Sequence, residues 1–501
     1  MLQPCFSEEK DLSGKYKGYN VILIIADSLR PDYLGCYNPE KKTSPNIDDL
    51  AGKSILFENA FCQVPITISS ISSIFTSTYL ISHNVRHIFK DNIPDTLYTL
   101  AELLHIYGYT TAWFGALGDP HSGANKSIMR GFEYKGKDYK QTREKNRKIR
   151  FIKEIKFNHI VSWIRKQENT PFFLTVHTYV VHGWHYPHFR FNNAFGKQLT
   201  SATKQFLEEK ITEVMKTIIS SDLFKGLKSR GYVKTWNTEV RYEYFRVLRE
   251  QSPEVGFKIT ELSQGLVKNI LLECDPALYN NYLTMLDSAV FELDDKLIGE
   301  LMRELARKGF KQKTIIIITA DHGDECREHG WIGHGTHLYD ESIRVPLIAY
   351  IPGIEKPRKR DALVQSIDIM PTILDLLGIP APYQTQGKSL VRLMEEAESK
   401  VQGSVFSEGA LLDHRFAVRT REWKYIQNID VVKKEDELYN LKDDPQEKNN
   451  LIHDRAEEAA KLRRRLEEWK KSFPVYGNTQ SEFLPEIDKE TQERIRKTGY
   501  W

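Results

Sequence analysis

A run of four isoleucines at residues 315–318 is the sequence feature that most constrains the fold of this chain. No polar residue interrupts the run, so it predicts a strand buried on both faces, as in a parallel sheet covered by helices. The run is followed directly by Thr319-Ala-Asp321-His322-Gly323. An acid and an imidazole therefore lie at the carboxyl end of a buried strand, which is where open α/β sheets bind their ligands.

A second apolar strand, residues 20–26, ends in the same way, with Asp27 and Ser28 directly after it. Because parallel strands present their carboxyl ends at one edge of a sheet, we expect Asp27, Asp321 and His322 to lie close together. Carboxylate and imidazole groups are suitable ligands for a divalent metal ion. A single acid at a strand end would more often cap the next helix, but two matched strand ends favour a metal site.

The composition is that of an ordinary soluble globular protein, with 40% apolar and 28% charged residues. A chain of 501 residues can hold one large domain and a smaller one. The formal charge of +3 is too small to indicate nucleic acid, so no nucleic-acid partner is expected. No stretch approaches the roughly 18 uninterrupted apolar residues of a membrane span.

The first residues and the cysteines both favour a cytoplasmic location. The start of the chain, Met1-Leu-Gln-Pro-Cys-Phe-Ser, lacks the basic segment and apolar run of a secretory signal. The five cysteines are few, odd in number and unclustered, which favours reduced thiols over a disulfide framework. The sequence does not indicate an oligomeric state.

Helical and strand patterns alternate along much of the chain, which is typical of an α/β sheet. Residues 95–107 predict a helix, and residues 110–115 predict the strand that follows it. Residues 65–76 are rich in Ser and Thr, but their apolar residues recur at helical spacing. Thr67 would stand near the start of that helix, where free amides favour an anion, although a Thr in this place is most often only an N-cap.

Another predicted strand, residues 171–177, leads into a segment unusually rich in histidine. His177, His182, His185 and His188 fall within twelve residues of one another. Any one of them would more often be structural or exposed. For the group, we expect at least one member in the active site.

The alternation of helices and strands suggests how the chain is divided. Residues 1–17 are polar and are expected to form a loose lead-in. The catalytic domain spans residues 18–390 and contains a charged, helical insertion or lid at residues 190–275, where the alternation stops. Short strands from about residue 400 predict a C-terminal subdomain at residues 391–475, followed by a tail at residues 476–501.

Short motifs in a fixed order run through residues 18–190 and 277–455. They are Ala26-Asp27-Ser28-Leu29-Arg30-Pro31-Asp32, Thr43-Ser-Pro-Asn-Ile-Asp48, His83-Asn-Val-Arg86, Thr319-Ala-Asp321-His322-Gly323-Asp324, Tyr339–Pro346, Asp368-Ile-Met-Pro-Thr372 and Glu437–Leu451. Each is weak alone, but together they resemble the sulfatase branch of the alkaline phosphatase superfamily. The resemblance implies an α/β fold with a mostly parallel sheet flanked by helices, and a small C-terminal antiparallel α+β subdomain.

The nucleophile segment departs from the pattern of that family. Typical sulfatases have Cys or Ser, then any residue, Pro, any residue and Arg, and the first residue is oxidised to formylglycine. Pro65 on one side and Phe75-Thr76 on the other align the nucleophile position with Thr67. The five residues Thr67–Ile71 contain neither the Pro nor the Arg, and Thr is not oxidised, so no formylglycine is expected. Related members that transfer phosphoryl groups use an unmodified Ser or Thr.

Other positions also differ from the family. Ser28 replaces the second aspartate of the usual pair, and His322 stands where many sulfatases have Asn. The lysine that usually follows the strand at residues 110–115 is absent.

The resemblance implies a role for each site residue. Asp27, Thr67, Asp321 and His322 would hold a divalent ion (Mn, Ca or Zn), which would activate the Thr67 hydroxyl for in-line attack. His182, together with His334 or His337, would contact the substrate oxygens or protonate the leaving oxygen.

Substrate binding is assigned to Arg86, His182 and His185. The substrate would be an ester of a small molecule, a glycan or a lipid head group.

Three functions remain open. An unmodified Thr67 favours a hydrolase or transferase of phosphate or phosphonate esters, and descent from sulfatases favours a sulfuric ester hydrolase. The third is a non-catalytic binding or structural member, which the joint retention of Asp27, Thr67, Asp321 and His322 argues against.

Overall fold

The computed structural model describes residues 12–86, 91–115, 123–137, 157–182, 276–354, 357–395, 403–409, 414–429 and 434–476. The expected insertion or lid at residues 190–275, His185 and His188 lie outside the described residues.

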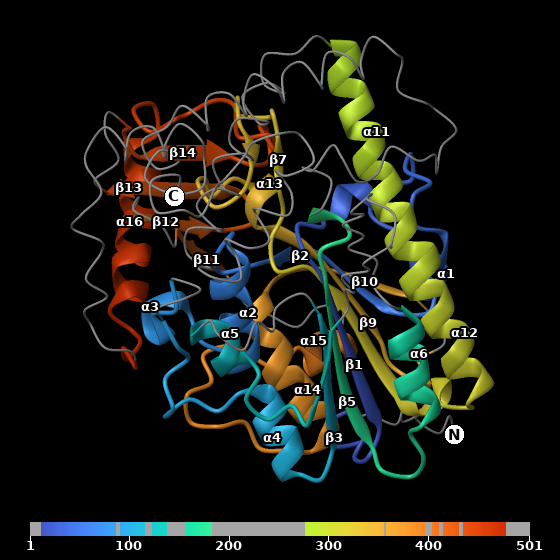
Figure 1. Cartoon of the computed structure of the whole chain (residues 1–501). Coiled ribbons are helices and arrows are strands. Elements are labelled where there is room, and N and C mark those ends of the chain that lie inside the picture. The colour runs from blue at the N-terminus through green and yellow to red at the C-terminus, as the bar shows by residue number, and fades with distance from the viewer. Residues whose placement is uncertain are drawn as a thin grey trace, which may run out of the picture.

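The centre of the molecule is an eight-stranded sheet with strand order β10-β2-β9-β6-β1-β5-β3-β4 (Figure 1). Its strands are β1 (Asn20–Ala26), β2 (Ile55–Phe61), β3 (Thr110–Gly115), β4 (Tyr134–Lys137), β5 (Phe172–Thr178), β6 (Thr314–Thr319), β9 (Arg344–Tyr350) and β10 (Arg358–Gln365). Neighbouring strands are parallel except where β9 pairs antiparallel with β6 and with β2. The mostly parallel sheet expected from the isoleucine run is therefore confirmed.

The register of the three central strands aligns their carboxyl ends. Every residue of β1, β5 and β6 is buried, as continuous apolar runs in a covered sheet require. Ile25 of β1 pairs with His177 of β5 on one side and with Thr319 of β6 on the other. Asp27 and Asp321 follow these strand ends directly, so the sheet delivers both acids to one edge.

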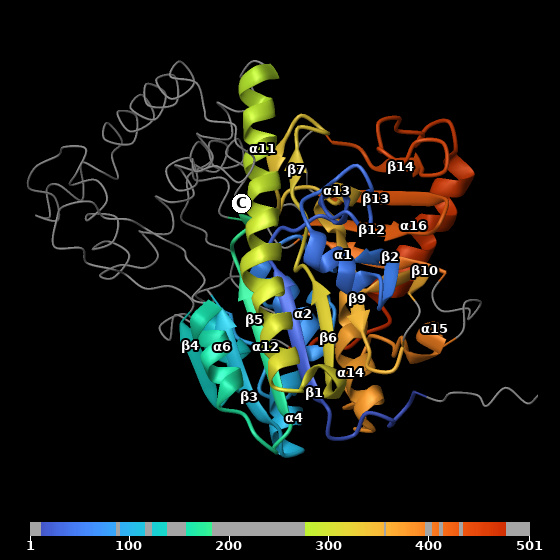
Figure 2. The same cartoon turned by 90° about the vertical axis from the view of Figure 1, so that its right-hand side faces the viewer.

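Helices cover both faces of the sheet (Figures 1 and 2). The described helices are α1 (Pro45–Ala51), α2 (Thr67–Thr76), α3 (Leu80–His83), α4 (Leu100–Ile106), α5 (Gly123–Ile128), α6 (Phe157–Arg165), α11 (Pro276–Glu292), α12 (Glu300–Arg307), α13 (Asp340–Ile343), α14 (Ile369–Leu377), α15 (Val391–Glu395) and α16 (Ala456–Lys470). A π-helical segment, Leu293–Gly299, joins α11 to α12.

Two adjacent phenylalanines of β5 show how the faces are divided. Phe173 packs against Phe75 of α2, with ring centroids 6.5 Å apart. Phe172 packs against Trp163 of α6, with ring centroids 5.4 Å apart. Because successive side chains of a strand point to opposite faces, α2 and α6 lie on opposite sides of the sheet.

The C-terminal part forms a separate antiparallel sheet in the order β11-β12-β13-β14, as expected from the short strands there. Its strands are β11 (Val405–Glu408), β12 (His414–Arg419), β13 (Trp423–Ile429) and β14 (Glu437–Asn440). Helix α16 lies along this sheet, where Trp469 stacks on Phe406 with ring centroids 4.8 Å apart.

A buried lysine joins this sheet to the edge that carries the acids. Lys424 of β13 is fully buried and pairs with Asp340 at 2.9 Å and with Glu447 at 2.7 Å. Asp340 is the first residue of α13 and also pairs with Arg419 at 3.2 Å. Burial lowers the pKa of Lys424, but these two carboxylates outweigh burial and raise it above its usual value.

Two expectations about local structure were wrong. The helix predicted at residues 95–107 begins only at Leu100, because Thr99 and Glu102 form a capping box that fixes its start. Residues 12–17 are not a loose lead-in: Leu12 and Tyr16 are buried, and the N–H of Tyr16 donates to the carbonyl of Leu376.

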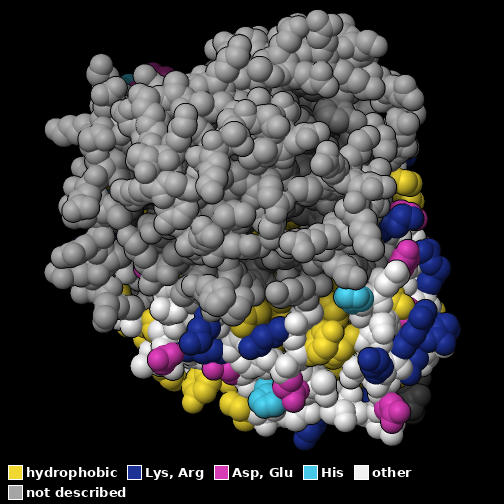
Figure 3. Space-filling view, viewed as in Figure 1, with side chains coloured by type: hydrophobic (Ala, Val, Ile, Leu, Met, Phe, Trp, Pro, Cys, Tyr) yellow, Lys and Arg dark blue, Asp and Glu magenta, His cyan; other side chains and the backbone are white. Residues whose placement is uncertain are grey.

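On the described part of the face shown in Figure 3, Lys and Arg side chains are interspersed with Asp and Glu. Within the part of the chain that the structure describes, no helix is long and apolar enough to cross a membrane.

We expect Lys424→Ala to destabilise the fold by about 3–5 kcal/mol, because it leaves buried carboxylates without their cation. Lys461→Ala is the matched control, since Lys461 is 67% exposed and pairs with Glu458 on the surface of α16. That control should change stability by no more than about 0.5 kcal/mol. Urea denaturation of both variants measures the difference, and equal midpoints would show that the buried pairs do not stabilise the fold.

Candidate active site

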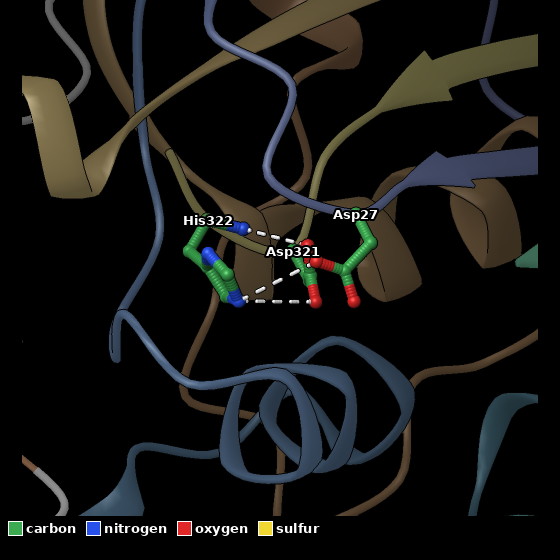
Figure 4. Close-up of side chains that lie close together, drawn as sticks. All are labelled: Asp27, Asp321 and His322. Carbon is green, nitrogen blue, oxygen red and sulfur yellow. Dashed lines mark hydrogen bonds and ion pairs between the residues drawn. The ribbon is translucent and has the colours of Figure 1, made fainter. Parts of the chain in front are cut away.

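Asp27, Asp321 and His322 lie together at the carboxyl edge of the sheet, as the two strand ends predicted (Figure 4). All three side chains are fully buried, and one ligand atom from each lies within 4.8 Å of the others. Asp27 follows β1, whereas Asp321 and His322 follow β6. Neighbouring parallel strands therefore supply all three groups.

Hydrogen bonds around Ser28 fix the two carboxylates. Ser28 has the left-handed φ of 62°, which is uncommon for a residue other than glycine. Its N–H donates to Asp321 Oδ1 at 3.3 Å, and its hydroxyl donates to Asp27 Oδ1 at 2.9 Å. The N–H of His322 also donates to Asp321 Oδ1, at 3.0 Å. Among the described residues, Asp321 Oδ2 is buried and accepts no hydrogen bond, which suits a metal ligand.

The imidazole of His322 is oriented with Nε2 toward the carboxylates. Its Nδ1 lies 2.8 Å from the carbonyl oxygen of Gly323, to which it donates, so in the neutral imidazole the lone pair is on Nε2. Nε2 lies 3.5 Å from Asp321 Oδ2 and 3.9 Å from Asp27 Oδ1. This tautomer is the one that binds a metal through Nε2.

Thr67 completes the cluster from the other side. Its Oγ1 lies 3.2 Å from Asp27 Oδ2 and 3.3 Å from His322 Nε2. Thr67 is the first residue of α2, and the N-cap is Ile66, whose side chain makes no capping hydrogen bond. The hydroxyl therefore faces the acids instead of serving as the helix cap.

The charges of the cluster are strongly unbalanced. Burial opposes ionisation of Asp27, but nearby imidazoles, chiefly His182, hold the pKa of its carboxyl well below its usual range. Burial and the neighbouring charge of Asp27 raise the pKa of Asp321 to about 6. Burial lowers the pKa of His322, but Asp321 and Asp27 outweigh it and raise the pKa above its usual value. A cation would relieve the repulsion between the two carboxylates.

The donor set fits a divalent metal ion. It combines two carboxylates, one imidazole and one hydroxyl, and Asp321 Oδ2 makes no hydrogen bond within the described part of the chain. Such mixed oxygen and nitrogen donors suit Mn²⁺, Zn²⁺ or Ca²⁺ and do not discriminate sharply among them.

His334 and His182 lie beside this cluster. The ring of His334 lies 4.1 Å from that of His322 and 5.3 Å from that of His182. His334 Nδ1 lies 3.0 Å from Asp324 Oδ1, so Asp324 holds the proton on that nitrogen. The sequence motif contained Asp324, but its support of His334 had not been foreseen.

Arg30 fixes the turn that carries Asp324. Its guanidinium donates to the carbonyl oxygen of Asp324 at 3.0 Å, to Asp32 at 2.7 Å and to Glu328 at 2.6 Å. The sequence motif Arg30-Pro-Asp32 already contained two members of this network of contacts, Arg30 and Asp32.

His337, the open alternative to His334, has different contacts. Its Nδ1 lies 3.0 Å from Glu325, a buried acid that also accepts the hydroxyl of Ser342. Of the two histidines, His334 is the one that contacts His322.

Arg86 is tied to the C-terminal sheet by its described contacts. Its guanidinium donates to Asn84 Oδ1 at 2.9 Å and to the carbonyl oxygen of Gly409 at 3.3 Å, and it lies 3.9 Å from Glu408. His185, the other expected substrate-binding residue, lies outside the described residues.

His177 is a site residue that the sequence only partly indicated. It was one of four clustered histidines, and its Nε2 lies 3.6 Å from Asp27 Oδ2. The pairing of β5 with β1 causes this contact.

Two buried carboxylates, a buried imidazole and a hydroxyl meet at this edge of the sheet, and comparison with known proteins assigns the chain to a class of hydrolases. The family model described as sulfatase matches residues 19–379, and the model of the N-sulphoglucosamine sulphohydrolase C-terminal region matches residues 327–472. The chain belongs to the sulfatase family.

Individual relatives differ in their activities. The chain is similar to an N-acetylglucosamine-6-O-sulfatase of Bacteroides thetaiotaomicron, with 26% identity over 94% of this chain and 89% of the relative. It is also similar to arylsulfatase K of Bos taurus, with 25% identity over 86% of this chain and 78% of the relative. A phosphonate monoester hydrolase of Agrobacterium radiobacter shares the fold, with a TM-score of 0.62, 17% identity, and coverage of 90% of this chain and 95% of that chain.

We expect Mn²⁺, Zn²⁺ or Ca²⁺ to raise the melting temperature of the native protein, because the ion binds the folded state alone. At an ion concentration of one hundred times Kd, binding stabilises the folded state by about 2.7 kcal/mol. Asp321→Asn should lose most of this stabilisation, whereas Asp49→Asn, on the surface beside Lys53, should keep it. Thermal unfolding with and without each ion measures the effect, and an equal rise in Asp321→Asn would contradict the assignment.

Proposed function

We propose that this chain is a metal-dependent hydrolase of phosphate or phosphonate esters that forms a covalent intermediate on unmodified Thr67. The position of Thr67 Oγ1, 3.2 Å from Asp27 Oδ2 and 3.3 Å from His322 Nε2, carries the proposal. A hydroxyl at the start of a ten-residue helix, next to buried acids, is placed as a nucleophile would be.

The residues of the chain orient the nucleophile. A divalent ion held by Asp27, Thr67, Asp321 and His322 would supply electrostatic stabilisation of the charge that develops on the substrate oxygens. The hydroxyl of Thr67 donates to Asp27 Oδ2, which fixes the direction of Oγ1. The first intrahelical bond at this end runs from the N–H of Ser70 to the carbonyl of Ile66, so the preceding amides favour an anion nearby.

We assign protonation of the leaving group to the histidines beside the cluster. As the bond from Thr67 Oγ1 to phosphorus forms, the hydroxyl proton of Thr67 passes to its acceptor, Asp27 Oδ2. The bond from phosphorus to the ester oxygen breaks, and that oxygen takes a proton from His334 or His182. Asp324 holds His334 in one tautomer through Nδ1. Water then attacks phosphorus and gives one proton to the histidine that protonated the leaving group. The bond from phosphorus to Thr67 Oγ1 breaks, and Oγ1 takes back its proton from Asp27.

Sulfate ester hydrolysis is the second candidate, and the relatives favour it. Two similar proteins are named N-acetylglucosamine-6-O-sulfatase and arylsulfatase K. The nucleophile segment favours phosphorus instead, because Thr67 lacks the context and the chemistry for conversion to formylglycine. The organic part of the substrate would be a small molecule, a glycan or a lipid head group.

We expect a panel of nitrophenyl esters to separate the two candidates. Turnover of a phosphate monoester, a phosphate diester or a phosphonate ester should exceed turnover of the aryl sulfate. Mass spectrometry of the peptide that contains residue 67 should show an unmodified Thr. A clear preference for the aryl sulfate would support the second candidate, and turnover of none of the four would favour the non-catalytic alternative.

We expect Thr67→Ala and Thr67→Asn to lower kcat by several powers of ten, each worth about 1.4 kcal/mol of barrier. Thr67→Ser keeps a hydroxyl and should retain substantial activity. Thr76→Ala removes a hydroxyl at the far end of the same helix, where Oγ1 donates to the carbonyl of Ser72. That control should keep native kcat.

High activity in Thr67→Ala would place the nucleophile elsewhere. Ser69 would then be the next candidate, since the hydroxyl of Ser70 already donates to the carbonyl of Asp321 at 2.6 Å.

A further inference from the structure

We propose that His177 is a positioning residue that holds the Asp27 carboxylate in its metal-binding orientation and thereby sets the affinity for the ion. This inference rests on the proposed metal-dependent function. It assigns a role to a histidine that lies on a neighbouring strand and is not itself in the ligand cluster.

The sheet brings His177 to the correct face. His177 lies four positions after Phe173 on β5, so the two side chains point to the same face. Phe173 packs on Phe75 of α2, which places His177 on the face that carries Thr67. In the next strand, Ile25 is the register partner of His177, and Asp27 lies two residues beyond it.

Asp27 is the polar group that His177 meets. The imidazole is fully buried, and neither ring nitrogen makes a hydrogen bond within the described residues. Burying an imidazole N–H without a hydrogen-bond acceptor is energetically unfavourable, so we expect an acceptor near the ring of His177. That acceptor is Asp27 Oδ2, 3.6 Å from Nε2, and a small tilt of the ring closes this distance to the roughly 2.7–3.2 Å of a hydrogen bond.

Neighbouring groups fix the ring of His177. The ring of Tyr179 lies 4.9 Å away and that of Trp113 lies 5.9 Å away. On β3, the register partner of His177 is Gly115. A Cβ at Gly115 would lie only 3.0 Å from Cβ of His177 and 2.9 Å from its carbonyl oxygen, so the glycine leaves the space that His177 fills.

His177 therefore supplies a second polar contact to Oδ2 of Asp27, in addition to the hydroxyl of Thr67. Oδ1 accepts the hydroxyl of Ser28 at 2.9 Å. Oδ2 lies 3.2 Å from Thr67 Oγ1 and 3.6 Å from His177 Nε2. Ligating carboxylates are commonly held by such outer hydrogen bonds, and losing one typically weakens metal binding about 10–100-fold.

The test compares side chains that differ in reach. The amide nitrogen of Gln can take the place of Nε2, whereas the shorter Asn cannot, and Leu has no donor. Titration calorimetry of the full chain with Mn²⁺, and in parallel with Zn²⁺ and Ca²⁺, gives Kd for each ion. We expect His177→Asn and His177→Leu to raise Kd about 10–100-fold, and His177→Gln to stay within about threefold of native.

A second buried histidine provides the control. His83 is as buried as His177 but bonds to Ser73 Oγ at 2.9 Å and accepts the N–H of Val85. His83→Leu should lower the melting temperature of the metal-free protein and leave Kd unchanged, which separates loss of stability from loss of positioning.

Native Kd in folded His177→Asn and His177→Leu would overturn this inference and leave the proposed function intact. If either of these two variants fails to fold, Kd of the other variant and Kd of His177→Gln are still measured. A Kd of His177→Gln that is tenfold higher than native would also contradict the inference. Failure of the native protein to bind any of the three ions would overturn the metal-dependent function itself.

Discussion

The structure of the site depends on two carboxylates that are forced together in the protein interior. Asp27 and Asp321 are both fully buried, and burial together with the neighbouring charge of Asp27 raises the pKa of Asp321 to about 6. Like charges at short range in a medium of low dielectric constant repel strongly. The surrounding groups are mainly donors and imidazoles: Ser28, His322 and His177 each approach one of the two carboxylates. A cation would neutralise the negative charge that these groups leave uncompensated.

Sequence periodicity was sufficient to predict the strands at the centre of the sheet. The uninterrupted run at residues 315–318 predicted a covered strand, and the acids after it and after β1 predicted the cluster. The start of α4 was missed although its signal was present, since Thr99 and Glu102 have the spacing of a capping box. The antiparallel direction of β9 was not predictable, because a buried run looks the same in either direction.

The finer parts of the site depend on relations that a sequence does not contain. His177 was one histidine among four until the register of β5 against β1 placed it beside Asp27. His334 and His337 are close in sequence, and only the acids that they meet distinguish them: Asp324 for the first and Glu325 for the second. Flanking residues could align Thr67 with a nucleophile position. That Ile66 is the N-cap, and Thr67 the first residue of the helix, is visible only in the structure.

The hydrogen bond from Ser28 to Asp321 has a consequence for how the protein folds. It joins residues 293 positions apart, so the site closes a very long loop. Contacts of such separation form only when the strands between them are in register, and a slip of one residue would turn the side chains to the opposite face. We therefore expect the cluster to be assembled late, after β1 and β6 have paired. An ion that needs all of these ligands would bind to the finished sheet and would not guide its assembly.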